Sequence, residues 1–120
     1  MALKPTKNIW FNGELVPWES AQIHVLSYAL HYGSAVFEGI RAYSTNNGTK
    51  IFRLDEHIKR LFNSAKIYRM NIAYSQQEIM EACKTIITTN ELNTGAYIRP
   101  IAFRGYNDLG LHASKDDDVE

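Results

Sequence analysis

The chain of 120 residues carries 13 lysines and arginines against 13 aspartates and glutamates, and 45% of its residues are hydrophobic. This composition is ordinary for one globular domain, and the balanced charge gives no net positive field that would favour nucleic acid or an anionic membrane. The single cysteine, Cys83, excludes an internal disulfide, and no apolar run approaches the roughly 20 residues of a membrane span. Because residues 1–7 also lack the apolar core of a signal peptide, a cytoplasmic location is expected.

The first half of the chain predicts antiparallel strands. A small hairpin is expected over residues 1–18, because the dipeptide Asn12-Gly13 separates two short apolar runs and both of its residues tolerate positive φ. Residues 35–43 alternate like a strand, and a turn at residues 46–48 leads into a second strand over residues 50–53.

Two amphipathic helices and a last strand follow. Asp55 is expected to cap the first helix, and Ser75 with Glu78 forms a capping-box pattern before the second. The apolar stripe of the first helix is formed by Leu54, Ile58, Leu61, Ala65 and Tyr68. That of the second helix is formed by Ile79, Cys83, Ile86 and Ile87. With a strand over residues 96–104, the sequence predicts an α+β fold, an antiparallel sheet with two helices packed on one face.

One face of the predicted strand over residues 35–43 is poorly suited to a core. The alternate positions on this face are Phe37, Gly39, Arg41 and Tyr43. Aromatic rings, bare backbone and a cation are better suited to lining a cofactor or substrate pocket. Glu38 points to the opposite, apolar face, where pairing with a cation is expected rather than acid–base chemistry.

Three other side chains have both a structural and a functional interpretation. Arg60 follows Glu56 by one helical turn, so it forms either an exposed Glu56–Arg60 pair or a guanidinium fork directed at a phosphate. Tyr97 and Arg99 leave the same face of the last strand, where Arg99 forms either a cross-strand ion pair or part of a site. Pro100 lacks an N–H and favours an interrupted ladder, where a site can open. The four histidines show no metal-ligand spacing, so no metal site is predicted.

In combination, three segments resemble the branched-chain amino acid aminotransferases, class IV aminotransferases of fold type IV that depend on pyridoxal 5′-phosphate (PLP). These segments are Tyr32–Arg41, Glu56–Leu61 with the following Ser64-Ala65-Lys66, and Tyr97–Pro100. The resemblance covers nearly the whole chain, from Ile9 to Gly110. D-amino acid aminotransferases and aminodeoxychorismate lyases are the alternatives within the family, but they usually have aspartate at the Ser34 position and lack the Phe-Glu-Gly-Ile-Arg continuation.

The resemblance implies a role for each matching residue. Arg60 is expected to bind the PLP phosphate, and Phe37 with Gly39 to line the pocket for a branched aliphatic side chain. Tyr97 is expected to contact the substrate carboxylate, and Arg99 to bind the distal carboxylate of glutamate. The remaining pair, Tyr32 and Leu111, is expected to complete the pocket of the neighbouring subunit in a homodimer.

The family's catalytic lysine has no counterpart among the lysines of this chain, which are Lys4, Lys7, Lys50, Lys59, Lys66, Lys84 and Lys115. PLP transamination requires a lysine that forms a Schiff base with the cofactor and then moves a proton. In the family, this lysine lies in a second, larger domain, which is expected beyond Glu120. Residues 1–120 are therefore interpreted as the small N-terminal domain, inactive on its own.

A non-catalytic binding or dimerisation module is the alternative from a different functional class. The face that carries Phe37, Tyr97 and Arg99 would then be a protein interface, because aromatic residues and arginine are also enriched at binding hot spots. A downstream domain with a suitably placed lysine would favour the enzyme over the module.

Overall fold

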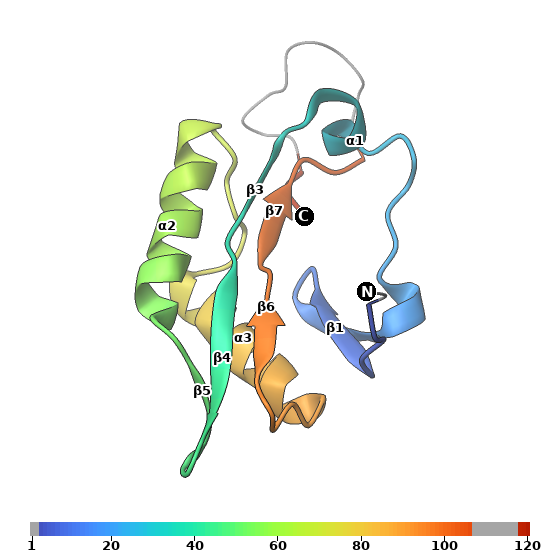
Figure 1. Ribbon diagram of the computed structural model, residues 1–120. Coiled ribbons are helices and arrows are strands. Elements are labelled where there is room, and N and C mark those ends of the chain that lie inside the picture. Colours follow the sequence, from blue (N-terminus) through green and yellow to red (C-terminus); the bar gives the residue numbers. More distant parts are fainter. Residues whose placement is uncertain (1–2, 107–117) are drawn as a thin grey trace.

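The computed structural model describes residues 3–106 and 118–120, over which short strands alternate with helices (Figure 1). The elements are β1 (Asn8–Phe11), β2 (Glu14–Pro17), a 3-10 turn η1 (Trp18–Ser20), α1 (Tyr28–Tyr32), β3 (Ala35–Phe37), β4 (Ile40–Thr45), β5 (Gly48–Ile51), α2 (Leu54–Ile67), α3 (Gln76–Thr89), β6 (Ala96–Ile98) and β7 (Ile101–Phe103). Over these residues the strands form antiparallel ladders in the orders β1-β2, β3-β7 and β5-β4-β6. The predicted α+β fold is confirmed.

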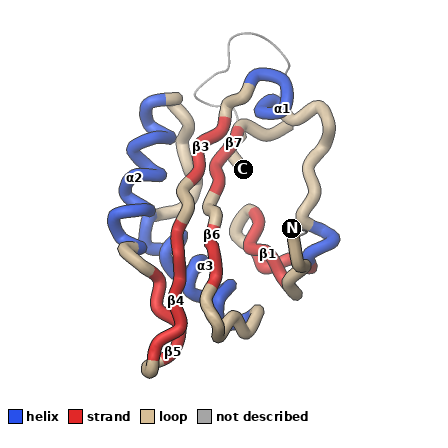
Figure 2. Tube along the Cα trace, in the orientation of Figure 1, coloured by secondary structure: helices blue, strands red, loops and turns tan. Residues whose placement is uncertain are grey.

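Strand β3 leads directly into β4, and together they run beside β7 and β6 (Figure 2). Each of the two predicted long strands is nevertheless broken in the middle, at Glu38-Gly39 and at Arg99-Pro100. The break occurs because Pro100 has no N–H to donate to a ladder, although its carbonyl still accepts a 3.1 Å hydrogen bond from the backbone N–H of Glu38. The interruption expected at Pro100 is confirmed, whereas continuous strands over 35–43 and 96–104 are wrong.

The two long helices, α2 and α3, cover one face of these strands, and the core lies between the helices and that face. Its buried residues come from the strands (Val36, Ile40, Ala42, Ile98, Ala102) and from α2, α3 and their connection (Ile58, Leu61, Ala65, Met70, Ile79, Cys83, Ile87). Within the predicted stripes, Tyr68 is exposed, and Leu54 and Ile86 are only partly buried. The opposite face of the strands carries exposed aromatic side chains, as the alternation over residues 35–43 predicts.

The two long helices begin in different ways. At α3 the capping box is confirmed, because the Glu78 N–H donates to Ser75 Oγ at 3.1 Å and the Ser75 N–H donates to Glu78 Oε2 at 2.7 Å. At α2 the expected cap is wrong, since Asp55 lies inside the first turn and Arg53 precedes the helix with a φ of 54°. The chain turns directly from β5 into α2, and Asp55 stabilises the helix there through the helix dipole instead.

The predicted hairpin is confirmed and is attached to the helices. Its turn residues Asn12 and Gly13 have φ values of 49° and 89°, as a two-residue hairpin turn requires. The ring of Trp10 packs edge-on against Tyr74 with centroids 5.1 Å apart, and β1 lies against α3.

The short helix α1, which was not predicted from the sequence, lies directly before Gly33. The backbone N–H groups of Tyr28 and Ala29 donate to the carbonyls of Gly105 and Arg104, at 2.9 and 3.0 Å. The first turn of α1 is therefore completed by a distant part of the chain. Gly33 ends the helix with a φ of 70°, which glycine adopts readily.

Candidate functional site

A buried carboxylate and an exposed guanidinium form the first of two clusters. Glu38, on the break between β3 and β4, is only 5% exposed. Arg60, on α2, donates from Nε to Glu38 Oε1 and from Nη2 to Glu38 Oε2, each at 2.6 Å. His57, one turn earlier on α2, lies with Nδ1 2.9 Å from Glu38 Oε2. The predicted pairing of Glu38 with a cation is confirmed, and Arg60 is its partner.

The two hydrogen bonds between Arg60 and Glu38 determine the electrostatics of this first cluster. The hydrogen bonds from Arg60 hold the pKa of the Glu38 carboxyl below its usual value, although burial of the carboxyl acts in the opposite direction. The same contact raises the pKa of Arg60. The exposed Glu56–Arg60 pair is wrong, because Glu56 lies next to Arg53 instead, 3.4 Å from its Nη2.

The second cluster combines three residues on the exposed face of the strands. The guanidinium carbon of Arg99 lies 4.2 Å from the centre of the Phe37 ring, a cation–π distance, and Arg99 Nη2 donates to the Tyr97 hydroxyl at 2.7 Å. Gly39 completes the group, because a Cβ built on it would lie 3.0 Å from Tyr97 Cζ. A side chain at Gly39 would therefore displace the Tyr97 ring.

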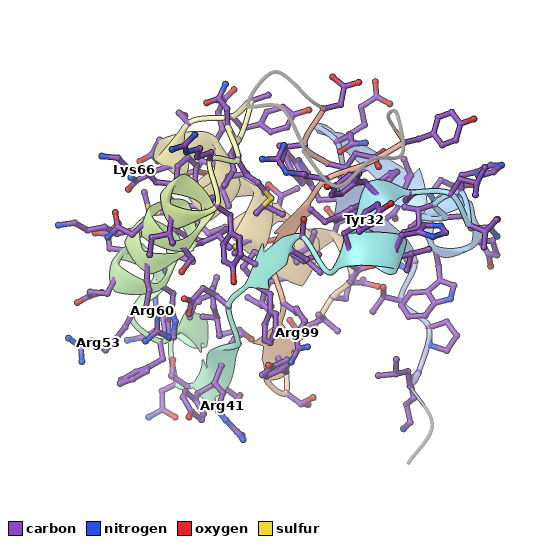
Figure 3. The ribbon with its side chains drawn as sticks, turned by 90° about the horizontal axis from the view of Figure 1, so that it is seen from above. Tyr32, Arg41, Arg53, Arg60, Lys66 and Arg99 are labelled. Atoms are coloured by element: carbon purple, nitrogen blue, oxygen red, sulfur yellow. The ribbon has the colours of Figure 1, made fainter. Side chains whose placement is uncertain are left out.

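Both clusters are built on one tripeptide, Phe37-Glu38-Gly39. Because successive side chains of an extended chain point to opposite faces, Glu38 turns toward α2 while Phe37 turns toward Arg99. Figure 3 shows Arg41, Arg60 and Arg99 toward the same side of the molecule. Arg41 pairs in register with Tyr97 across β4 and β6, which adds a third cation to this side.

The remaining predicted site residues do not join these clusters in the described chain. Tyr32 lies on α1, with its ring 4.5 Å from that of Tyr28. Leu111 lies outside the described residues. The roles of both residues in a neighbouring subunit stay predictions.

The link between Glu38, His57 and Arg60 was not predicted from the sequence. A signal for it was present, because His57 and Arg60 are three residues apart and so share one side of a helix. Glu38 is the charged residue on the apolar face of the strand that this helix covers, where a carboxylate needs partners. The direction of the Arg60 side chain, which decides the pairing, depends on how the helix packs.

Arg60 fits one end of a phosphorylated cofactor. Its side chain is 67% exposed, and only Nε and Nη2 are engaged, so Nη1 has no partner among residues 3–106 and 118–120. A guanidinium held in this way presents its free N–H donors outward, the geometry in which arginine binds phosphate oxygens. Over the same residues, no group of three histidines, cysteines or carboxylates could hold a metal ion, and no helix is long and apolar enough to cross a membrane.

A family model described as Amino-transferase class IV matches residues 35–119, which include both clusters. The chain belongs to the class IV aminotransferases. The resemblance seen in the sequence is confirmed, and the fold matches the N-terminal part of aminotransferases of fold type IV.

Other members of this class are similar over most of the chain. The branched-chain-amino-acid aminotransferase of Escherichia coli (strain K12) is 52% identical over 112 residues, which is 93% of this chain and 36% of that protein. A solved structure of the branched-chain amino acid aminotransferase from Escherichia coli matches with a TM-score of 0.90 and 48% identity, over 95% of this chain and 38% of that one.

A branched-chain amino acid aminotransferase from T.th., solved in complex with N-(5′-phosphopyridoxyl)-L-glutamate, matches with a TM-score of 0.85 and 51% identity. That match covers 88% of this chain and 35% of the solved one. The chain thus spans about a third of the length of the class IV aminotransferases it matches.

Proposed function

We propose that this chain is the N-terminal domain of a PLP-dependent branched-chain amino acid aminotransferase. The enzyme would transfer the α-amino group reversibly between leucine, isoleucine or valine and 2-oxoglutarate. One observation carries the proposal, namely that two exposed guanidinium groups flank the same tripeptide, Phe37-Glu38-Gly39, one fixed by Glu38 and the other resting on the Phe37 ring. The 52% identity to the Escherichia coli aminotransferase supports it.

Arg60 would hold the phosphate of PLP. Its free N–H donors would bind phosphate oxygens, while Glu38 occupies the other edge of the guanidinium. When bound, PLP supplies the electron sink through which an amino group leaves one substrate and joins another. The ligand of the T.th. relative, which joins a phosphopyridoxyl group to glutamate, supports PLP as the cofactor and glutamate as the amino donor.

The second cluster would bind the substrates. Phe37 and the bare backbone of Gly39 would line the space for a branched aliphatic side chain, and the Tyr97 hydroxyl would contact the carboxylate that all these substrates share. Arg99 would bind the distal carboxylate of glutamate. With leucine bound, Arg99 would retain the Tyr97 hydroxyl and the Phe37 ring, so the guanidinium would not be left unpaired beside an apolar ligand.

The proposal requires groups that these 120 residues do not supply. The lysine that bonds to the cofactor would lie beyond Glu120, in a second and larger domain. A homodimer would bring Tyr32 and Leu111 of each subunit to the pocket of the other. A cytoplasmic location is likewise a prediction.

The proposal is tested by comparing residues 1–120 with the full-length protein, both purified from a host that lacks the enzyme. We expect the full-length protein, supplied with PLP, to convert leucine and 2-oxoglutarate into 4-methyl-2-oxopentanoate and glutamate, and residues 1–120 to have no activity. Turnover by residues 1–120 alone would contradict the assignment of the lysine to another domain. A full-length protein that transaminates D-alanine but not leucine would support the D-amino acid aminotransferases instead.

A further inference from the structure

Glu38 is a charged group in a place where charges are costly. Its carboxylate is 5% exposed, yet both of its oxygens are engaged, Oε1 by Arg60 and Oε2 by Arg60 and His57. A buried carboxylate with this complete a set of partners is held in one orientation. In the proposed function Arg60 binds the phosphate, but Glu38 and His57 contact neither the cofactor nor the substrate.

We propose that Glu38 is a positioning residue that aims the Arg60 guanidinium at the cofactor phosphate, and that His57 fixes Glu38 in turn. The inference rests on the proposed function, because it needs a phosphate at Arg60. It adds a chain of contacts that runs from the break between β3 and β4 to the exposed side of α2.

The geometry of the contact explains why Glu38 can aim Arg60. An exposed arginine on a helix has several flexible torsions and loses much rotational freedom when it binds a ligand. The carboxylate contacts Arg60 along the Nε–Nη2 edge, which fixes both the plane of the guanidinium and the direction of its free Nη1. The loss of freedom therefore occurs on folding, before any phosphate binds.

A purely electrostatic view predicts the opposite effect. The negative charge of Glu38 repels a phosphate, so removing that charge without any loss of positioning would strengthen phosphate binding. If Glu38 instead positions Arg60, removing the Glu38 charge should weaken phosphate binding. Because the two signs are opposite, one measurement distinguishes them.

The test compares PLP with pyridoxal, which lacks only the phosphate, in titrations of the full-length apoprotein followed by absorbance. We expect Glu38→Gln to raise the Kd for PLP by roughly 10-fold, the size of one or two charge-assisted hydrogen bonds, and to leave the Kd for pyridoxal unchanged. In an Arg60→Lys background, which cannot form the two-pronged contact, Glu38→Gln should have no further effect on PLP binding. A merely structural role would change the stability of the apoprotein without this dependence on the phosphate.

Two further variants keep the test decisive. Glu56→Gln is the matched control, because it removes an exposed carboxylate of the same helix that contacts Arg53 rather than Arg60. If Glu38→Gln does not fold, His57→Phe serves instead; it removes one contact to Glu38 and should raise the Kd for PLP by about threefold, with pyridoxal again unchanged.

An unchanged or lowered Kd for PLP in the folded variant would overturn the inference, as would equal losses for PLP and pyridoxal. A wild-type protein that binds neither compound would instead overturn the proposed function, so the two failures are distinguishable.

Discussion

Arg60 and Arg99 flank the same tripeptide but are held in opposite ways. Arg60 is fixed by two hydrogen bonds of 2.6 Å to a carboxylate that is 5% exposed. Within residues 3–106 and 118–120, Arg99 donates one hydrogen bond, to the hydroxyl of Tyr97, and lies over the ring of Phe37. Both of these aromatic side chains are more than half exposed. Both guanidinium groups are exposed, but Arg60 is anchored to a buried carboxylate, whereas the partners of Arg99 are themselves exposed.

Under the proposed function, the difference would match two kinds of ligand. A group that stays bound through every turnover is best held by a donor that does not move, because a fixed donor loses no freedom on binding. A site that accepts glutamate in one half-reaction and leucine in the other needs a cation that can engage one of them and withdraw from the other. Under the proposed function, the contrast in anchoring would be the structural counterpart of a permanent cofactor and an alternating substrate.

The largest effect is expected from Arg60→Ala in the full-length protein. Loss of the charged phosphate donor should raise the Kd for PLP on the order of 100-fold. Among the described residues, it also leaves His57 as the only side chain paired with buried Glu38, so the free energy of unfolding measured with urea should fall as well. Lys59→Ala, an exposed neighbour on the same helix, is the control and should change neither quantity. A Kd for PLP within about twofold of the wild type would remove Arg60 from the phosphate site.

Arg99→Ala should alter selectivity more than cofactor binding. We expect kcat/KM for glutamate to fall roughly 10- to 100-fold more than kcat/KM for leucine, because only glutamate has a distal carboxylate to lose its partner. The Kd for PLP should stay close to the wild-type value. Equal losses for the two amino acids would contradict the assignment of Arg99 and would make the two arginines alike in function.

The sequence predicted those parts of the fold that depend on neighbouring residues. Asn12-Gly13 predicts its hairpin and Ser75 with Glu78 its helix start, because each signal acts within a few residues. The outward face of Phe37 and Gly39 followed from simple alternation along a strand. These predictions hold because the deciding forces are local.

The features that were not predicted from the sequence depend on distant parts of the chain. The first turn of α1 is completed by the carbonyls of Arg104 and Gly105, which nothing near Tyr28 indicates. Arg60 pairs with Glu38, because α2 packs against the strands that carry this carboxylate. It does not pair with Glu56, which lies one helical turn earlier. A residue-by-residue pattern identifies which side chains are charged, but packing decides which of them meet.

Lowering the pH should remove the stability that the Glu38–Arg60 pair contributes to the fold. Since Arg60 lowers the pKa of Glu38 in the folded state, the stability from this pair is complete above the unfolded-state value of 4.5 and is lost as pH falls through the lower folded-state pKa. Wild-type apoprotein should therefore be more stable than Glu38→Gln at pH 7, and the difference should shrink as the pH falls below about 4.5. Urea unfolding at several pH values measures it. A difference that is constant across that range would show that the Glu38 charge contributes nothing to the fold.

The smallest effect is expected from Tyr97→Phe, which removes the hydroxyl that accepts from Arg99 at 2.7 Å and keeps the ring beside Gly39. We expect kcat/KM to fall about threefold for leucine and glutamate alike, because the proposed contact is to the carboxylate they share and an exposed hydrogen bond is weak. Tyr43→Phe, on the same outward face, is the control. If Tyr97→Phe instead lowered glutamate turnover selectively, as Arg99→Ala should, the hydroxyl would be holding Arg99 in place. Arg99 would then be a fixed group like Arg60, and the contrast between the two clusters would no longer explain how one site takes both substrates.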